Sequence, residues 1–560
     1  MKNKLLKLLA VIFCGATLAL GITACGEKDK MDNVVEVAKS VFIVKDGEIT
    51  GLTREGKQLS ELHIPTKIGK ITITDIAAGA FKDCSNLTSV ILPDGLKTIA
   101  PSMFAGCSNL TSIHIPDSVT FIGRSVFEDC SSLKNITISD SVTFIGDSAF
   151  KGCSSLSEMR LPFVGVEKNA TYYDTYFGSI FGGTSSKDSN DYVPASLKTV
   201  TIAGGVIAAN AFIGCRNLTS VKLLDGVTEI GASAFAGCSS LTSIDVPDNV
   251  TSIGGSAFKG CSSLSEMRLP FVGAAKNAIY DTYFGYIFGG TSSTHGNDYV
   301  PESLKAVTIT GGAIAENAFK DCGSLTSIDI PAGVTSIGKS TFLNCSSLTS
   351  IDIPAGVTSI DKFAFSHCSS LTNIVIPAGV TSIGDNVFSY CSSLTGIQII
   401  DGVTSIGQYA FYECISLKNI LLPDNLTSIG RYAFYNCDSL TNIVIPNGVT
   451  SIGQDVFYGC ISLTSIRLSD NLTSIGAWAF YNCDSLTNII IPNGVTSIAS
   501  SAFAYCDSLT IYCERASKPM IGWDLDWNDS DCPVYWYSET QPTTDGNYWH
   551  YVNGAPTVWE

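Results

Sequence analysis

Apolar and polar residues alternate along this chain in a pattern that recurs every 23 residues. Within residues 241–261, the apolar side chains of Leu241, Ile244 and Val246 are separated by polar residues. Alternation with a period of two predicts a short strand whose apolar residues face a core. Pro247 ends this strand, because proline lacks the N–H group that a hydrogen-bonded ladder requires. Each repeat therefore begins with one half-buried strand.

The rest of the same repeat predicts two bends and a return to the core. The Asp-Asn pair at residues 248–249 favours a turn, and Gly254 permits a second bend. Val250 and Ile253 bring apolar side chains back inside, and Phe258 fills the interior. One such coil can bury its apolar side only against the coils before and after it. The repeat therefore predicts a mostly β solenoid of the α/β class, built from stacked coils.

Cysteine marks one fixed position of this repeat. Sixteen of the 20 cysteines keep the 23-residue spacing within three runs, which contain Cys84, Cys107, Cys130 and Cys153, then Cys215, Cys238 and Cys261, then the nine from Cys322 to Cys506. One cysteine per coil lacks the close C-x-x-C pairs of metal sites, so we expect a ladder of buried free thiols and no metal. Cys513 and Cys532 stand outside this spacing in one terminal segment. For this pair the sequence leaves a disulfide and two free thiols open.

Deviations from the repeat mark the ends of the solenoid. Residues 41–83 predict a degenerate N-terminal capping coil, residues 84–512 the solenoid, and residues 513–560 a C-terminal cap. The last segment contains five of the six tryptophans, which either cover the final coil or bind sugar: Trp523, Trp527, Trp536, Trp549 and Trp559. The sequence therefore predicts one repetitive body with an atypical coil at each end.

Two near copies of one insertion interrupt the solenoid at about residues 162–200 and 270–307. Both contain Y-D-T-Y-F-G-x-I-F-G-G-T-S-S followed by N-D-Y-V-P. Aromatic residues in a long surface loop can serve as binding anchors, whereas the same residues folded back form local core. The sequence leaves both interpretations open for Tyr176, Phe177 and Phe181, and for Tyr283, Phe284 and Phe288.

The first 25 residues have the form of an export signal. Three lysines precede an apolar run over residues 8–20, which is too short to span a membrane. The run leads into residues 22–25 (Ile-Thr-Ala-Cys), which resemble a bacterial lipobox. The resemblance implies a diacylglyceryl group on Cys25, whereas a plain secretory signal would leave this cysteine unmodified. With residues 26–40 as a polar tether, we expect an exported chain held by its lipid at the outside of the cell membrane or cell surface.

The repeat itself resembles a known family. Sixteen copies of L-T-S-I-x-I-P-x-x-V-T-S-I-G-x-x-A-F-x-x-C cover about residues 76–512. This pattern is similar to that of the BspA-like leucine-rich-repeat surface proteins of host-associated bacteria and some mucosal protists. The resemblance implies a right-handed leucine-rich-repeat superhelix and an adhesin that contacts host matrix proteins or other microbes. The identity of the ligand does not follow, because these proteins differ in their outward residues.

Charge and chemistry exclude several classes of function. The chain has 34 basic and 51 acidic residues, a net charge of −17, and loss of the three signal lysines takes it to −20. A polyanion of this size repels nucleic acid, so we expect no nucleic-acid partner. The five histidines lie in unlike contexts and no nucleophile elbow is present. We therefore expect no enzyme, no catalytic residue and no cofactor.

Two sets of outward residues in the C-terminal half are the candidate ligand-binding positions. On the strand face, the residue two before the proline position changes from acidic, at Asp329 and Asp352, to a mostly apolar series: Val375, Gln398, Leu421, Val444, Arg467 and Ile490. An exposed apolar series suits a protein partner, although β-branched residues also favour strands for structural reasons alone.

The second set is aromatic and recurs at the coil period on the turn side: Tyr409, Tyr412, Tyr432, Tyr435, Tyr458, Trp478 and Tyr481. Aromatic ladders stack on sugar rings or fill protein pockets, and packing between neighbouring turns explains the same pattern. Outward residues that vary over an invariant core predict an adhesion protein that binds a protein or glycan and touches the membrane only through its lipid. A glycan-capture lipoprotein and a passive spacer are the alternatives.

Overall fold

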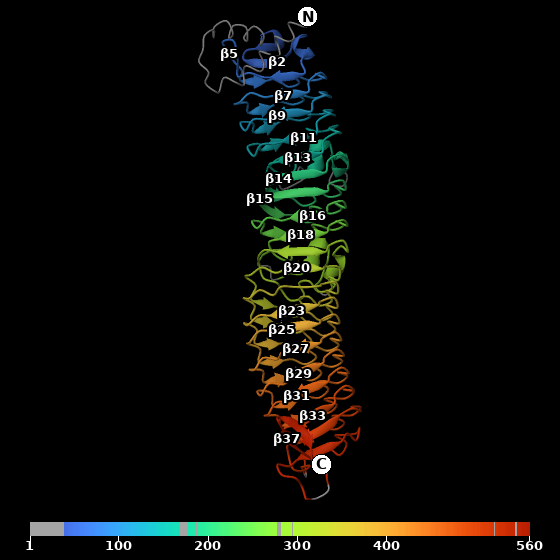
Figure 1. Cartoon of the computed structure of the whole chain (residues 1–560). Coiled ribbons are helices and arrows are strands. Elements are labelled where there is room, and N and C mark those ends of the chain that lie inside the picture. Colours follow the sequence, from blue (N-terminus) through green and yellow to red (C-terminus); the bar gives the residue numbers. More distant parts are fainter. Residues whose placement is uncertain are drawn as a thin grey trace. The chain divides into compact units, whose positions relative to one another are not determined.

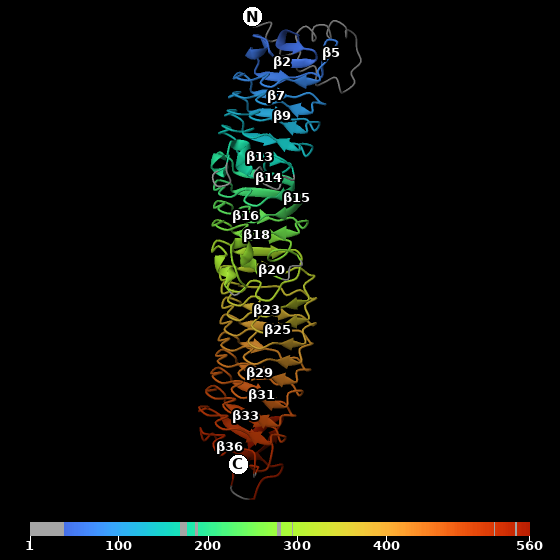
Figure 2. The ribbon, with the colours of Figure 1, turned by 180° about the vertical axis from the view of Figure 1, so that it is seen from behind.

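The computed structural model describes residues 39–168, 176–184, 189–276, 280, 282–293, 295–519, 521–543 and 546–559. Cys25, the export signal and residues 26–38 lie outside this range, so what we expect of them stays a prediction. The chain divides into two compact units, residues 1–264 (unit 1) and residues 265–560 (unit 2). Figures 1 and 2 show that, within each unit, short strands of successive coils lie one above another.

The coil at residues 241–261 shows how the sequence builds each repeat. Its first strand is β16 (Ser243–Asp245), in which only the central Ile244 is buried. Its second strand is β17 (Ser252–Ile253). The side chains predicted to face the core are at most 3% exposed: Leu241, Ile244, Val246, Val250, Ile253 and Phe258. The predicted mostly β solenoid is confirmed, and regular helix within the described residues is limited to residues 39–41 and short 3₁₀ turns such as η1 (Gly56–Gln58).

Unit 1 arranges its strands in two parallel stacks behind an N-terminal hairpin. The hairpin pairs β1 (Phe42–Lys45) with β2 (Glu48–Leu52), and β2 runs parallel to β6 (Asp75–Ile76). A second short hairpin joins β4 (Lys67–Ile68) to β5 (Ile71–Thr72). The first stack contains β3 (Glu61–His63), β7 (Ser89–Ile91), β9 (Ser112–His114), β11 (Asn135–Thr137), β13 (Glu158–Leu161), β14 (Thr199–Ile207), β15 (Ser220–Ile230) and β16. The second contains β8 (Thr98–Ile99), β10 (Phe121–Ile122), β12 (Phe144–Ile145) and β17.

Unit 2 repeats the same two stacks. The first contains β18 (Glu266–Leu269), β19 (Ala306–Ile309), β20 (Ser327–Asp329), β23 (Asn373–Ile376), β25 (Gly396–Ile399), β27 (Asn419–Ile420), β29 (Asn442–Val444), β31 (Ser465–Arg467), β33 (Asn488–Ile491), β35 (Thr510–Cys513) and β36 (Val534–Tyr537). The second contains β21 (Ser336–Ile337), β22 (Ser359–Ile360), β24 (Ser382–Ile383), β26 (Ser405–Ile406), β28 (Ser428–Ile429), β30 (Ser451–Ile452), β32 (Ser474–Ile475) and β34 (Ser497–Ile498). Equivalent residues of successive coils therefore form straight columns.

Side-chain ladders inside the coils hold these columns together. The Phe434 ring stacks on the Phe457 ring of the next coil, with 5.5 Å between their centroids. The Cys437 thiol donates a hydrogen bond to the Phe411 carbonyl oxygen at 3.2 Å. Both side chains are fully buried, so each coil contributes one aromatic ring and one thiol to a continuous interior. The predicted ladder of buried thiols is confirmed.

The terminal cysteine pair does not form a disulfide. All 18 cysteines within the described residues are free and buried. Cys532 places its sulfur 3.5 Å from the Cys506 carbonyl oxygen and so extends the thiol ladder by one position. Cys513 lies instead on β35, opposite Ile491. The disulfide between Cys513 and Cys532 is therefore the wrong alternative, because the two side chains belong to different columns.

The aromatic residues of both insertions fold back into the core. They form the 3₁₀ turns η2 (Phe177–Phe181) and η4 (Phe284–Phe288), whose four phenylalanines are at most 2% exposed. Phe177 packs on Phe212 of the next coil at 4.8 Å between centroids. Tyr283 is also buried and donates its hydroxyl to the Gly290 carbonyl oxygen. The interpretation as local core is confirmed for these residues, whereas Tyr176 is half-buried.

One buried asparagine fastens each insertion to the coil that follows it. Asn190, on η3 (Ser189–Tyr192), accepts the Gly178 N–H through Oδ1 at 2.6 Å. Its Nδ2 donates to the Ile213 carbonyl oxygen at 2.8 Å. Asn297, on η5 (Gly296–Tyr299), makes the equivalent bonds in the second insertion. The asparagine of the N-D-Y motif therefore has a structural role: it holds the insertion to the next coil, and a buried amide without these hydrogen bonds would destabilise the fold.

The C-terminal segment ends in an antiparallel hairpin of β37 (Tyr548–Val552) and β38 (Ala555–Val558). Trp549 is fully buried there, and its Nε1 donates to the Cys513 carbonyl oxygen at 3.0 Å. Pro556 removes one N–H from edge strand β38, which limits further strand pairing. This geometry suits the predicted cap, and the division at residue 513 stays a prediction.

Candidate binding surfaces of unit 2

The strand row is the outward column formed by Asp329, Asp352, Val375, Gln398, Leu421, Val444, Arg467 and Ile490. It follows the first stack of unit 2, where Val375 on β23 pairs in register with Gln398 on β25, and Val444 on β29 with Arg467 on β31. Leu421 is 80% exposed, Val444 56% and Val375 47%, whereas Ile490 is half-buried. The row thus presents three aliphatic side chains to solvent, as the sequence predicts.

Sequence reasoning missed the continuation of this row. Ile490 pairs with Tyr512, and Tyr512 pairs with Tyr535 on β36. The two tyrosine rings stack at 5.7 Å between centroids. The coil is shorter by one residue here and lacks the usual proline, so the 23-residue spacing that located the other members does not reach these two.

The tyrosine column consists of Tyr412, Tyr435, Tyr458 and Tyr481 on the turn side of unit 2. Their rings stack nearly parallel, with centroid distances of 4.8, 4.5 and 4.5 Å along the column. Tyr390 meets Tyr412 edge-on at one end, at 5.3 Å. The structure therefore brings together the tyrosines that the sequence places in one register.

The same ladder extends past both ends predicted for it. His367 stacks on Tyr390 at 4.4 Å, and Tyr505 tilts against Tyr481 at 4.9 Å. His367, Tyr390 and Tyr505 directly precede their cysteines, whereas the tyrosine column lies two residues before its cysteines. Because these three residues are shifted by one position, the fixed 23-residue spacing identifies only the other four of the seven rings.

Stacking determines which part of each tyrosine meets a ligand. Inner rings have both faces covered by neighbours, so their hydroxyl edges are what remains for contact. Burial raises the pKa of Tyr412 and of Tyr435 to about 12. Tyr412 and Tyr435 are thus neutral phenols at physiological pH, and the inner rings of the column offer no free face to a sugar.

The turn column consists of Tyr409, Tyr432 and Trp478, five residues before the cysteine of their coils. Tyr409 and Tyr432 stack at 4.6 Å, and Trp478 is 40% exposed. Asp455 takes the place of an aromatic residue between them and is 4% exposed, and this burial raises the pKa of its carboxyl group. The column therefore consists of a stacked tyrosine pair, a buried acid and a more exposed indole.

Backbone conformation sets the turn column apart from ordinary packing. Tyr409, Tyr432 and Trp478 have φ of 57°, 58° and 54°, in the left-handed region. In unit 1 the same position is filled by Gly79, Ser102, Ser125, Ser148, Asn210, Ser233 and Ser256. A bulky residue in this region costs about 1 kcal/mol, whereas glycine and asparagine adopt it readily. These aromatic residues, and Phe363 at the same position of an earlier coil, therefore replace the small residues that other coils of both units have there, such as Asn317 and Ser340 in unit 2.

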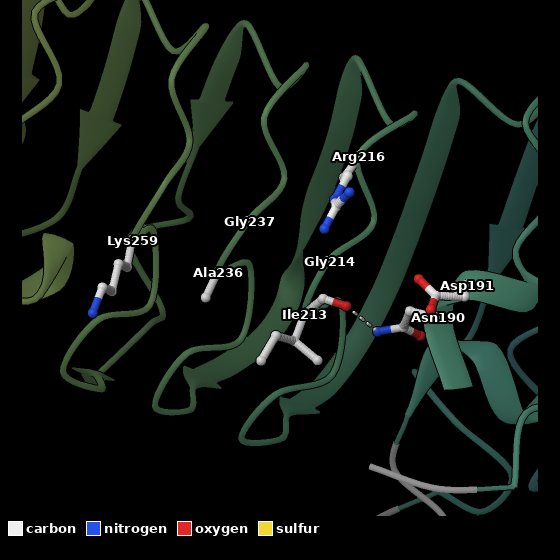
Figure 3. A pocket seen from close by; sticks show the side chains of 8 residues that line it. All are labelled: Asn190, Asp191, Ile213, Gly214, Arg216, Ala236, Gly237 and Lys259. Atoms are coloured by element: carbon white, nitrogen blue, oxygen red, sulfur yellow. Dashed lines mark hydrogen bonds between the residues drawn. The ribbon is translucent and has the colours of Figure 1, made fainter. Parts of the chain in front are cut away.

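Unit 1 contains a pocket of about 480 Å³ beside the first insertion (Figure 3). Arg216, Lys259 and Asp191 line it, so its rim carries both signs of charge. Gly214 and Gly237 line it without side chains, and the space beside Gly214 is open, since a Cβ there would meet no atom within 4 Å. The Asn190 amide at its edge is already bonded to the next coil. Sequence reasoning missed this pocket because its walls come from segments more than 20 residues apart.

The described residues contain neither a metal cluster nor a membrane span. No three histidine, cysteine, aspartate or glutamate side chains among them are grouped to hold a metal ion. No helix in the same part of the chain is both long enough and apolar enough to cross a membrane.

Comparison with known proteins assigns the repeat. The family model described as BspA type Leucine rich repeat region, in 6 copies, matches residues 55–177, 189–287, 312–441 and 427–513. The chain belongs to this family. The resemblance seen in the repeat is thereby confirmed. No curated protein matches the chain.

Several solved structures share the leucine-rich repeat of this BspA-type chain. A leucine-rich repeat protein from Bacteroides ovatus is 26% identical, with a TM-score of 0.30 over 85% of this chain and 97% of that one. A leucine rich cell surface protein from Faecalibacterium prausnitzii is 25% identical, with a TM-score of 0.24 over 80% of this chain and 96% of that one. These TM-scores are low, so the family assignment rests on the repeat model.

Proposed function

We propose that this BspA-type chain is a cell-surface binding protein that contacts host or microbial macromolecules through the outward columns of unit 2. The turn column and the tyrosine column make the main contact, and the strand row offers a second surface. A lipid on Cys25 holds the exported chain to the membrane.

The turn column carries this proposal. Tyr409, Tyr432 and Trp478 stand at left-handed positions where serine, asparagine or glycine folds at lower cost. Residues that work against local backbone preference concentrate at functional sites, because selection for binding offsets the loss of stability. Tyrosine and tryptophan are also the side chains that most often dominate the binding energy of protein interfaces.

The ring geometry favours a protein over a glycan as the ligand. Sugar rings stack on exposed aromatic faces, and the inner tyrosines are covered on both faces by neighbours at 4.5–4.8 Å. Hydroxyl edges that both donate and accept hydrogen bonds suit the polar backbone and side chains of a protein. A passive spacer, in turn, gives no reason for aromatic residues to replace serine in only one unit.

A binding screen tests the proposed function. Purified residues 26–560 are incubated with arrays of extracellular-matrix proteins, bacterial surface proteins and glycans, at concentrations below 1 µM. We expect saturable binding to at least one protein. Binding to glycans alone supports the glycan-capture alternative, and binding to no array component contradicts the proposed function.

The lipid anchor requires its own test. Cells that express the full chain are grown with a labelled fatty acid, and the protein is isolated. We expect label on the wild-type chain and none on a Cys25→Ala variant, because the thioether forms only at a cysteine sulfur. A Cys25→Ala chain that still carries label contradicts the anchor, and Cys14→Ala is the matched control that keeps the label.

A further inference from the structure

We propose that the strand row is an interface between two copies of this chain, which pair antiparallel through unit 2. The inference rests on the proposed function only in treating the outward columns as binding surface. The turn and tyrosine columns belong to the turn side of the coils, so a partner on the strand row leaves them free for a ligand.

The order of residues along the row is self-complementary. A two-fold axis placed between the coils of Gln398 and Leu421 reverses the row and lays it against its own copy. Val375 then faces Val444 of the second copy, and Gln398 faces Leu421, which is 80% exposed. Every such contact occurs twice, as in any isologous interface.

The charges next to the apolar centre match in the same arrangement, while at the outer ends Asp329 faces Ile490. The axis that pairs Val375 with Val444 brings Asp352 opposite Arg467, so each end of the apolar centre gains an ion pair. Among the residues that the structure describes, Arg467 forms an ion pair with Asp470 alone, at 3.8 Å, and both side chains are largely exposed. An arginine in such a weak surface pair remains available to a second carboxylate. Parallel pairing would instead set like residues near each other, including Asp352 near Asp352.

The neighbouring outward column does not oppose this contact. It is uncharged and consists of Asn373, Gly396, Asn419, Asn442 and Ser465. Asn373 and Asn442 face each other across the proposed axis, and amides form hydrogen bonds in either direction. Polar residues beside an apolar centre with charges at its ends are the usual anatomy of a specific interface.

The size of the contact predicts a weak dimer. Eight coils at about 4.8 Å spacing give a length of about 35 Å, and the strand row with the outward column beside it gives a width of about 12 Å. About 800 Å² in total is then buried, which is below the roughly 1,000 Å² of a stable specific interface and therefore indicates a weak, transient pair. Such a pair forms little in dilute solution, and it needs high local concentrations of the two copies. Antiparallel pairing also turns the N-terminal ends of the two copies of unit 2 in opposite directions.

Sedimentation equilibrium of residues 26–560, at about 5 to 500 µM, tests the inference. We expect a monomer–dimer equilibrium with a dissociation constant in the range of about 10–100 µM. Leu421→Asp is expected to weaken it at least tenfold, because it sets two carboxylates near the axis. Circular dichroism checks that each variant remains folded, which exposed positions permit.

A charge swap tests the register. Asp352→Arg and Arg467→Asp, each alone, are expected to weaken the dimer about tenfold, and the two together to restore it. Asp329→Arg combined with Arg467→Asp is the matched control and is not expected to restore it. A wild-type chain that stays monomeric at 500 µM, or a double swap without recovery, overturns the inference. If the monomer still binds an array component, the proposed function stands without it.

Discussion

Raising the pH from 8 to about 11 is expected to unfold the repeat coils, because folding keeps their thiols neutral. Burial raises the pKa of the Cys391 thiol from 9.0 to about 12, and the same cause raises the pKa of Cys414 and Cys437. The unfolded chain releases these protons near pH 9, whereas the folded chain holds them until about pH 12. The contribution of the thiols to stability is therefore complete below pH 9 and is lost as the pH rises toward 12.

The size of this effect follows from the number of thiols in the ladder. Between the unfolded and the folded pKa, each pH unit lowers the free energy of unfolding by about 1.4 kcal/mol per thiol. Four thiols that act together therefore lose about 6 kcal/mol at pH 10, which is comparable with the whole stability of an ordinary domain. Because each coil is stabilised only by its neighbours, the loss spreads along the stack.

Circular dichroism and tryptophan fluorescence, recorded from about pH 7 to pH 11 with a reductant present, measure the alkaline transition. We expect a cooperative change with a midpoint between about pH 9 and 10.5, and recovery on return to pH 8. Spectra that remain native up to pH 11 would mean that the thiols do not need to stay neutral in the fold.

Replacing Phe434 by alanine destabilises unit 2 by about 3–5 kcal/mol. The Phe434 ring is fully buried between Phe411 at 5.3 Å and Phe457 at 5.5 Å. Its loss leaves a cavity and two rings without a partner, and neighbouring coils cannot close the gap without breaking their own stacking. Urea unfolding followed by circular dichroism measures the change.

Phe121→Ala is the matched control for this prediction. Phe121 also stacks on a neighbouring ring, Phe144 at 4.6 Å, but it is 37% exposed. We expect a loss of about 1 kcal/mol or less, because water already covers much of the ring. Equal losses for the two variants would contradict the view that the buried ladder holds the coils together.

The fold was predictable because the same pattern of apolar and turn-forming residues recurs in coil after coil. Leu241, Ile244 and Phe258 each recur at fixed spacing, and the structure buries them as the alternation requires. The strand row and the tyrosine column were predictable for the same reason, since a fixed period places equivalent residues in one column. The sequence therefore predicts which side chains point outward, but it does not identify the ligand that they bind.

The parts that could not be predicted are those where the period fails. Tyr390 and Tyr505 lie one residue away from the tyrosine column and join it only through the geometry of the turn. Cys532 joins the thiol ladder although its spacing from Cys506 is 26 residues, so the sequence left a disulfide with Cys513 open. The left-handed backbone of the turn column is also invisible in the sequence, because Tyr409 and Trp478 are residues that rarely adopt it.

The most direct measurement compares ligand affinity between the wild-type chain and a variant with Tyr409→Asn, Tyr432→Asn and Trp478→Asn, using the protein identified by the array screen. We expect affinity to fall at least tenfold. The free energy of unfolding is expected to change by no more than about 1 kcal/mol, because asparagine adopts the left-handed conformation at lower cost and this gain offsets the lost stacking of the aromatic rings. A control with Ser125→Asn, Ser233→Asn and Ser256→Asn keeps full affinity. A turn-column variant that is folded and binds as tightly as the wild-type chain contradicts binding through the aromatic columns of unit 2.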